Sequence, residues 1–350
     1  MSKGKLKIHY FRIAAALFLV GIIIYGIIFI IKSFVFQDSQ STNNYINEIL
    51  TTIETSEYIT EPETETEPVS VYPSMSENAR LFPVDFDAKC GILIDTESNE
   101  IIAYKDYNKR MYPASLTKIM TMVVTVENAN SLSDTVPITY EMVGPMYELD
   151  ASLAGFAVGE TPTVEQVLYG VILPSGADAA IAAATYTAGS EDAFVKMMND
   201  KAEEIGLKNT HFTNCVGFHD PNHYSTAEDI AVLMKYALQN ETCKKILSTY
   251  QYEIPPTEFN PDGITLESTV LGRMNGDEMP GVVIKGGKTG FTDEAGQCLA
   301  TFAEANGKTY IMVLTGGTSR WNVVYNTLSG YSIMCVGGSA YVPPEVPDYD

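Results

Sequence analysis

A serine and a lysine three residues apart, Ser115 and Lys118, are the residues best suited to covalent chemistry in this chain. Side chains at i and i+3 lie on the same face of a helix, so the two groups can meet. A serine hydroxyl becomes an effective nucleophile when a neighbouring base takes its proton. A lysine can be that base if burial or another cation lowers its pKa. Ser-x-x-Lys is also a pattern that occurs by chance, so its meaning depends on the rest of the chain.

The residues around this pair predict a buried helix that holds both groups rigidly. Pro113 suits a first helical turn, where its missing N–H costs nothing. Apolar residues then follow at helical spacing on nearly every side: Ile119, Met120, Met122, Val123, Val124 and Val126. A helix that is apolar nearly all round is a core helix.

Two further segments carry reactive side chains. Ser175 follows Pro174 at a predicted hinge between two helices in 164–189, and Lys288-Thr289-Gly290 follows a predicted strand. Ser-x-x-Lys, a Ser-x-Asn-like element and Lys-Thr-Gly occur in this order in penicillin-binding proteins and class A β-lactamases. The joint pattern is far more specific than any one of its parts.

From about residue 88 to 317 the chain resembles D-alanyl-D-alanine carboxypeptidases, the low-molecular-mass penicillin-binding proteins of the serine Ser-x-x-Lys peptidase family. The resemblance extends beyond the three motifs to 164–176, 206–212, 224–229 and 288–296.

This resemblance implies a role for each reactive side chain. Ser115 is the expected nucleophile, which attacks the penultimate D-alanine carbonyl and releases the terminal D-alanine. Lys118 is the expected general base, and Ser175 is expected to pass a proton to the leaving amine. A β-lactam presents a strained amide at the same place, so β-lactams are expected to be covalent inhibitors.

The resemblance also implies a set of substrate-binding residues. Lys288 is expected across the cleft, where its charge helps keep Lys118 neutral and meets the substrate carboxylate. Thr289 and Gly290 continue this motif, and Thr289 is expected to bind the same carboxylate. The backbone N–H groups of Ser115 and Phe291 are expected to hold the oxyanion. Arg273 occupies the position of an arginine at the carboxylate end, with a plain surface charge as the alternative.

One position departs from the pattern, because Ala177 stands where the family commonly has asparagine. An asparagine side chain can donate to the substrate carbonyl and accept from the lysine, whereas alanine can do neither. The departure bears on the strength of catalysis more than on its type.

Other chemistries find little support in the sequence. No Gly-x-Ser-x-Gly nucleophile elbow occurs. His219 and His223, with Asp220, would have the spacing of metal ligands if they lay on one continuous helix. The intervening Pro221-Asn222 makes such a helix improbable, so no metal is expected. No glycine-rich phosphate loop precedes a helix, and no cofactor is expected. Gly286-Gly287 is interpreted as a strand edge left open for the substrate backbone.

The composition of the chain limits the classes of ligand and partner that it can bind. The formal charge of −22 makes a nucleic-acid partner improbable, because phosphates would be repelled. The five cysteines are scattered and odd in number, which argues against a disulfide framework and a zinc site. Most of them are expected to be small buried apolar residues.

The first 36 residues predict a short cytoplasmic tail and a transmembrane signal-anchor. The uncharged apolar run 13–31, extended by 33–36, can cross a hydrocarbon core of about 30 Å. A cleaved signal peptide is the alternative, but no Ala-x-Ala site follows the run. The basic residues before it predict a single-pass protein of the cell membrane with everything after the span outside the cell.

The remaining chain divides by composition. Residues 37–82 are rich in Thr, Ser, Glu and Pro and predict a disordered acidic linker, which serves as a tether or binds a cationic partner. Residues 83–340 are the predicted catalytic domain, and 341–350 a short acidic tail.

The order of elements within 83–340 predicts an α/β fold of the α+β type. Strands are expected at 90–95, 101–105, 281–285, 297–305 and 308–314, helices at 191–205 and 226–239, and a last helix from about 320. Strands, a helical insertion and further strands indicate an antiparallel sheet covered by helices. The resemblance implies a β-lactamase/transpeptidase-like sheet flanked by helices, with a helical subdomain.

The predicted function is a serine D-alanyl-D-alanine carboxypeptidase acting on peptidoglycan stem pentapeptides. Three alternatives stay open. A β-lactamase needs a glutamate that activates the deacylating water, and no convincing counterpart is present. A DD-endopeptidase on cross-links would use the same groups. A catalytically weak penicillin-binding module that senses wall peptides is supported only by Ala177.

Overall fold

The computed structural model describes residues 71–274 and 279–343, all of which belong to one compact unit, Val69–Asp350. The predicted membrane span at 13–31 and most of the predicted linker lie outside the described residues. Within 71–274 and 279–343, no helix is long and apolar enough to cross a membrane.

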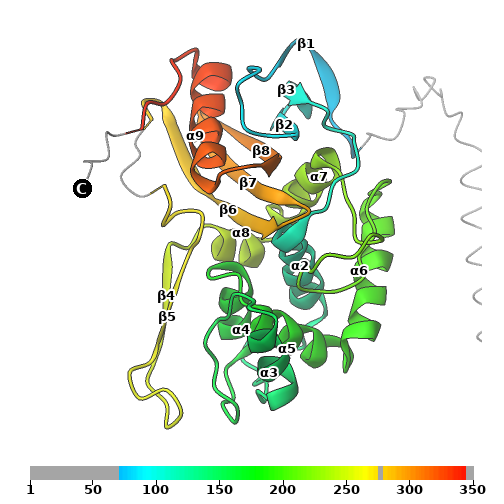
Figure 1. Cartoon of the computed structure of the whole chain (residues 1–350), viewed down its shortest axis with the longest axis vertical. Helices are drawn as coiled ribbons and strands as arrows, with labels where there is room; N and C mark the ends of the chain where they lie inside the picture. Colours follow the sequence, from blue (N-terminus) through cyan, green and yellow to red (C-terminus); the bar gives the residue numbers. More distant parts are fainter. Residues whose placement is uncertain (1–70, 275–278, 344–350) are drawn as a thin grey trace, which may run out of the picture. The chain divides into compact units, whose positions relative to one another are not determined.

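A six-stranded sheet is the framework of this unit, with strand order β1-β3-β2-β8-β7-β6 (Figure 1). The strands are β1 (Ser74–Leu81), β2 (Cys90–Asp95), β3 (Glu100–Lys105), β6 (Val282–Thr292), β7 (Gly296–Ala305) and β8 (Lys308–Gly317). The predicted β2–β3 and β7–β8 hairpins are confirmed. Asn306 and Gly307 turn the second hairpin at φ 52° and 76°, the left-handed pair that a type I′ turn requires.

Strand β1 corrects two predictions. The linker was expected to extend to residue 82, but Ser74–Leu81 form this edge strand. The sheet was expected to be antiparallel, and β1 pairs with β3 in parallel. Most β1 side chains are exposed, so no alternation of apolar and polar residues marks the strand in the sequence. Backbone pairing orders it instead, and just before it the Tyr72 hydroxyl donates to Asp229 at 2.6 Å.

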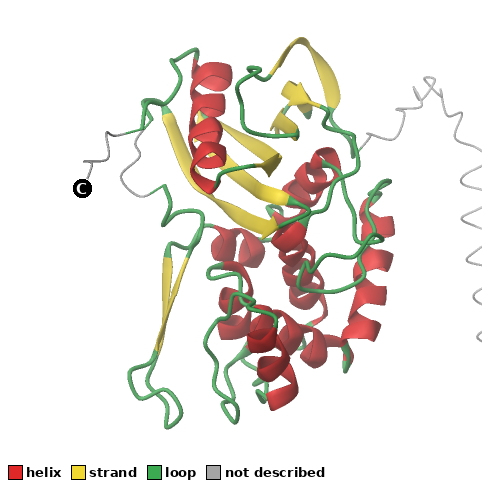
Figure 2. Ribbon diagram, in the orientation of Figure 1, coloured by secondary structure: helices red, strands yellow, loops and turns green. Residues whose placement is uncertain are grey.

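Helices cover both faces of the sheet (Figure 2). On one face lie α2 (Lys118–Asn128), α7 (Ala227–Ala237) and α8 (Glu241–Leu247), and on the other lies α9 (Arg320–Tyr331), followed by a π-helical turn, η2 (Ser332–Val336). Strand β2 alternates between the two cores: Ile92 and Ile94 face the first, and Leu93 faces the second. Burial on both faces explains its continuous apolar sequence.

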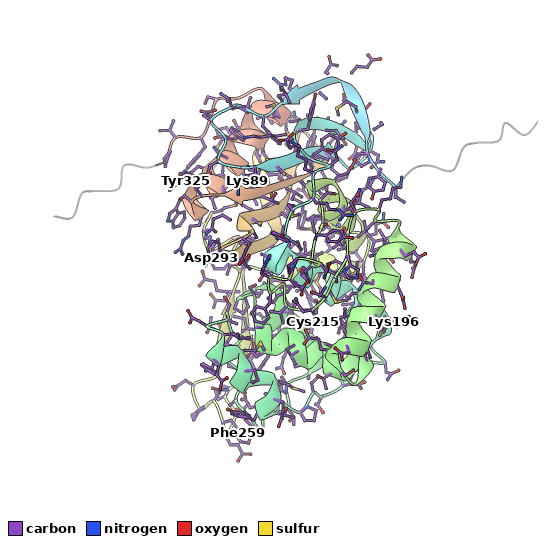
Figure 3. All side chains as sticks on the ribbon, turned by 45° about the vertical axis from the view of Figure 1, so that its right-hand side comes forward. Lys89, Lys196, Cys215, Phe259, Asp293 and Tyr325 are labelled. Atoms are coloured by element: carbon purple, nitrogen blue, oxygen red, sulfur yellow. The ribbon has the colours of Figure 1, made fainter. Side chains whose placement is uncertain are left out.

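A helical subdomain lies beside the sheet and consists of α3 (Tyr140–Glu148), α4 (Val164–Ile172), α5 (Ala177–Ala188) and α6 (Glu191–Ile205). The predicted hinge at Pro174-Ser175-Gly176 is confirmed, since these residues lie between the end of α4 and the start of α5. Helix α5, which follows the hinge, is rich in alanine. These small side chains allow α2, α3, α4 and α6 to pack against it. A separate ribbon of β4 (Gln251–Ile254) and β5 (Ile264–Glu267) projects from the unit, with Phe259 near its tip (Figure 3).

Candidate active site

The turn that carries Ser115 is held between two close backbone contacts. Ala114–Thr117 form a 3-10 turn, η1, which leads into α2 at Lys118. Ala114 has φ 47°, a left-handed conformation that costs a non-glycine residue roughly 1–2 kcal/mol. A Cβ on Gly290 of β6 would lie 3.1 Å from the backbone nitrogen of Ser115, and one on Gly217 would lie 2.0 Å from the Ala114 carbonyl oxygen. Glycines at both positions therefore allow the sheet and a loop to hold this turn from two sides.

Ser115 and Lys118 meet as their spacing predicts. The Nζ atom of Lys118 lies 3.1 Å from Ser115 Oγ, and it also donates to the carbonyl oxygen of Val216 at 2.8 Å. Burial of the side chain lowers the pKa of Lys118 to about 8. A useful fraction of this amine is therefore neutral near physiological pH and can accept the serine proton.

A second serine and lysine form another pair beside the first. Lys288 donates from Nζ to Ser175 Oγ and to the Thr289 carbonyl oxygen, both at 2.8 Å. Burial lowers the pKa of Lys288 well below its ordinary value, and the neighbouring Lys118 and Arg273 lower it further. Ser175 has φ 66°, so backbone strain marks both reactive serine turns.

The position of Lys288 corrects the expectation that it meets the substrate carboxylate. The side chain is fully buried behind Ser175, and its Nζ atom is already bound on two sides. Burial is the main cause of the lowered pKa of Lys118, and the repulsion between Lys118 and Lys288 lowers the pKa of Lys288.

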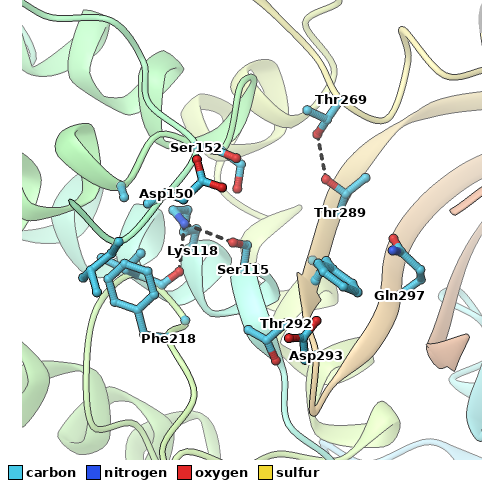
Figure 4. A pocket seen from close by; sticks show the side chains of 18 of the residues that line it. Ser115, Lys118, Asp150, Ser152, Phe218, Thr269, Thr289, Thr292, Asp293 and Gln297 are labelled. Carbon is cyan, nitrogen blue, oxygen red and sulfur yellow. Dashed lines mark hydrogen bonds between the residues drawn. The ribbon is translucent and has the colours of Figure 1, made fainter. Parts of the chain in front are cut away.

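A pocket of about 470 Å³ opens above Ser115 (Figure 4). Strand β6 supplies one wall with Thr289, Gly290 and Phe291. At one end the Thr289 hydroxyl lies 2.7 Å from that of Thr269, and Arg273 also lines the pocket. Of the two interpretations of Arg273, the structure supports the one that places it at the site.

The opposite wall is fixed by the first turn of α5. The backbone N–H of Ala177 donates to the Ser152 carbonyl at 2.8 Å. The carboxylate of Asp178 accepts from the backbone N–H groups of Ala154 at 2.8 Å and Gly155 at 3.2 Å. Burial raises the pKa of Asp178, although these N–H groups act in the opposite direction. Sequence reasoning assigned no role to Asp178, whose only signal was a carboxylate at the start of an alanine-rich helix.

Two further interpretations concern glycines and cysteines. Gly286-Gly287 lie in β6, which is an edge strand of the sheet, and the interpretation that this edge accepts the substrate backbone stays a prediction. A Cβ on Gly286 would lie 1.9 Å from the Leu247 carbonyl oxygen, and one on Gly287 would lie 2.1 Å from that of Ala300. The expected burial of most cysteines is confirmed, since Cys90, Cys215, Cys243 and Cys298 are buried and unpaired.

Of the described residues, His211, His219 and His223 all lie outside the pocket lining. His223 is buried, and its ring contacts the Thr117 hydroxyl and the Thr213 backbone nitrogen. In the part of the chain that the structure describes, no group of three His, Cys, Asp or Glu side chains could hold a metal ion.

The sheet, the helical subdomain and the two Ser–Lys pairs define the class of penicillin-binding serine peptidases. Residues 75–319 match the model of peptidase family S11, described as D-alanyl-D-alanine carboxypeptidase, and the chain belongs to this family.

The relatives agree with this assignment. The D-alanyl-D-alanine carboxypeptidase DacF of Bacillus subtilis (strain 168) is 34% identical over 241 residues, which are 67% of this chain and 58% of that protein. DacA of Escherichia coli (strain K12) is 33% identical over 66% of this chain and 56% of its own length. The chain thus matches somewhat more than half the length of these two relatives. The solved Streptomyces K15 DD-transpeptidase is 29% identical with a TM-score of 0.63, over 69% of this chain and 94% of that one.

Proposed function

We propose that this chain is a penicillin-sensitive serine D-alanyl-D-alanine carboxypeptidase that removes the terminal D-alanine from peptidoglycan stem pentapeptides. The observation that carries the proposal is the Ser115–Lys118 pair. The serine oxygen lies 3.1 Å from a fully buried amine whose pKa is lowered to about 8, at the base of an accessible pocket.

The proposed reaction begins when neutral Lys118 takes the hydroxyl proton of Ser115. The Oγ atom forms a bond to the penultimate D-alanine carbonyl, whose π electrons move onto the carbonyl oxygen. We assign the stabilisation of this oxyanion to the backbone N–H groups of Ser115, whose nitrogen lies close to Gly290, and of Phe291, the residue after Gly290 in β6.

The second half of acylation breaks the peptide bond. As the tetrahedral intermediate collapses, the C–N bond cleaves and the leaving amine takes a proton. Ser175, hydrogen-bonded to Lys288, is the group we assign to deliver that proton, which is replaced by the proton that Lys118 took from Ser115. Water then gives a proton to neutral Lys118 and attacks the ester on Ser115. Lys118 returns this proton to Ser115 Oγ as the ester bond breaks and the shortened peptide leaves.

The carboxylate of the substrate needs polar partners at the other end of the pocket. We assign this role to Arg273 and Thr289, because Lys288 is buried and engaged elsewhere. The Thr269 hydroxyl bonds to that of Thr289 and orients it.

Labelling with fluorescent penicillin tests the proposal. A wild-type adduct located on Ser115 by mass spectrometry, together with D-alanine release from a pentapeptide, supports it. Ser115→Ala should abolish labelling, whereas Ser175→Ala should still be labelled, more slowly. An adduct on Ser175, or labelling that persists in Ser115→Ala, would refute the assignment.

The acceptor of the acyl group separates carboxypeptidase from two related functions. A DD-endopeptidase releases a cross-linked peptide instead of free D-alanine, and a transpeptidase transfers the acyl group to an amine. The name of the Streptomyces K15 structure makes transfer worth testing. Product analysis with a pentapeptide, a cross-linked dimer and an added amine acceptor distinguishes the three, and we expect free D-alanine from the pentapeptide as the main product.

We also propose that residues 13–31 anchor the chain in the cell membrane, with the catalytic domain on the cell-wall side. The support is the length of the apolar run and the basic segment before it. Amino-terminal sequencing of membrane-extracted protein should find this segment intact. A mature chain that begins within 37–70 would show that it is a cleaved signal peptide.

A further inference from the structure

A tight turn at residues 214–218 forms the wall of the pocket beside Lys118, and one side chain organises it. The Oδ1 atom of Asn214 accepts from the backbone N–H groups of Val216, Gly217 and Phe218 at 3.2, 2.7 and 3.0 Å. Its Nδ2 atom donates to the Phe218 carbonyl at 3.0 Å. Three N–H groups that converge on one oxygen bend the backbone sharply, in the manner of an Asx turn.

This turn contacts both members of the Ser–Lys pair. The Val216 carbonyl oxygen accepts from Lys118 Nζ at 2.8 Å. Gly217, at φ 96°, packs against the Ala114 carbonyl next to Ser115, where a Cβ would clash. The shape that Asn214 imposes on the turn therefore sets where the lysine amine is held.

Two contacts that do not involve the Asn214 side chain fix the segment around the turn to α2, although Asn214 Nδ2 also lies 3.4 Å from His223 Nδ1. The hydroxyl of Thr121 donates to the Cys215 carbonyl at 2.7 Å. The ring of His223 accepts from the Thr213 N–H at Nδ1, so its other nitrogen carries the proton and donates to the Thr117 hydroxyl. Burial lowers the pKa of His223 to about 4, which keeps Nδ1 an acceptor near neutral pH. Loss of the Asn214 side chain should therefore loosen the turn without detaching the segment.

We propose that Asn214 is a positioning residue for the general base, an inference that rests on the proposed function. A neutral amine has two N–H bonds and one lone pair. By placing the Val216 carbonyl, Asn214 engages one N–H of Lys118 and leaves the lone pair directed at Ser115. When the amine takes the serine proton, the same carbonyl accepts from an ammonium, a stronger hydrogen bond.

Three variants of the full-length chain test this role. Asn214→Ala removes the four hydrogen bonds within the turn and the longer contacts of Nδ2 with Thr213 and His223, both at 3.4 Å. Asn214→Asp keeps an oxygen that can accept the three N–H groups. Asn240→Ala is the matched control, because Asn240 accepts from the N–H groups of Thr242 and Cys243 at the start of α8, away from the pocket. Fluorescent-penicillin acylation rates are measured from pH 6 to 10, alongside thermal unfolding.

We expect Asn214→Ala to be acylated about 10- to 100-fold more slowly, because the ammonium that forms loses its acceptor. For the same reason the pH inflection of acylation should move to lower pH. The titratable groups that face Lys118 are Cys215 within the turn, Asp178 of α5 and Lys288 of β6, and no variant replaces them. Asn214→Asp adds a carboxylate to the turn, which should move the inflection to higher pH. Asn214→Asp should stay within about threefold of wild type, and Asn240→Ala should lose stability without a change in inflection.

An unmoved inflection in folded Asn214→Ala, or a rate loss no larger than that of Asn240→Ala, would overturn the inference. If Asn214→Ala does not fold, Asn214→Ser is measured instead, and a wild-type rate and inflection in that variant would likewise overturn it. A wild-type chain that penicillin does not label would overturn the proposed function and this role with it. Wild-type labelling with unaffected Asn214 variants would overturn this role alone.

Discussion

The lowered pKa of Lys118 predicts how activity depends on pH. The general base must be neutral to take the Ser115 proton, so kcat/KM should rise with pH as Lys118 loses its own proton. The amine is fully buried, and that burial lowers its pKa to about 8 from the ordinary lysine value. A pH profile of kcat/KM reports the ionisation of the free enzyme, in which this pair is already assembled.

The size of the effect follows from the fraction of neutral amine. A group with a pKa of about 8 is roughly one tenth neutral at pH 7 and roughly nine tenths neutral at pH 9. We therefore expect kcat/KM to rise about tenfold over this interval and then to level off. A lysine of ordinary pKa would give a rise of about 100-fold over the same interval, with no plateau by pH 9.

The assay is D-alanine release from a D-Ala-D-Ala peptide between pH 6 and 10, with thermal unfolding followed at each pH. Lys118→Arg keeps a cation that does not deprotonate and should lose about 100- to 10,000-fold in kcat. Lys235→Met is the matched control, since Lys235 also has a pKa lowered by burial but bonds to Asn99, and neither residue lines the pocket. A profile that rises without a plateau to pH 10, or the same inflection in Lys118→Arg, would refute the assignment of Lys118 as the base.

Three further predictions concern single positions. Ala177→Asn should raise kcat/KM by up to about tenfold through one restored hydrogen bond, without changing the product. Because Ala177 is fully buried, its thermal unfolding must be checked, and a folded variant with a hundredfold loss would contradict the prediction. Arg273→Ala should lower kcat/KM by about 10- to 100-fold for a peptide with a free terminal carboxylate. The loss should be much smaller for the same peptide with an amide in place of that carboxylate, and equal losses for the two peptides would argue against a carboxylate-binding role of Arg273. Gly286→Ala should lower the free energy of unfolding by about 2–6 kcal/mol, since its Cβ would meet the Leu247 carbonyl. Gly189→Ala, at φ 79° with open space around it, should cost only about 1 kcal/mol, and equal denaturation midpoints for the two would contradict this explanation.

The sequence by itself determined the elements whose signals are local. Helical spacing predicted the buried helix behind Ser115, and Pro174 with Gly176 marked the hinge between α4 and α5. The Asn306-Gly307 pair predicted the β7–β8 turn, because only a few residues accept two consecutive positive φ angles. The order of the three motifs was sufficient to predict the family and the fold.

Only the tertiary structure decided how these groups are paired and charged. Lys288 was expected to face the substrate, but packing buries it against Ser175, whereas Arg273 lines the pocket. Strand β1 forms through backbone pairing with β3. The role of Asn214 depends on three backbone N–H groups that converge on its side-chain oxygen, and no sequence spacing predicts this convergence. The desolvation of a buried side chain, and the close approach of one backbone segment to another, both depend on segments that are distant in the sequence. The pKa of Lys118 and the need for glycine at 217, 286 and 290 therefore become apparent only when those segments are packed together.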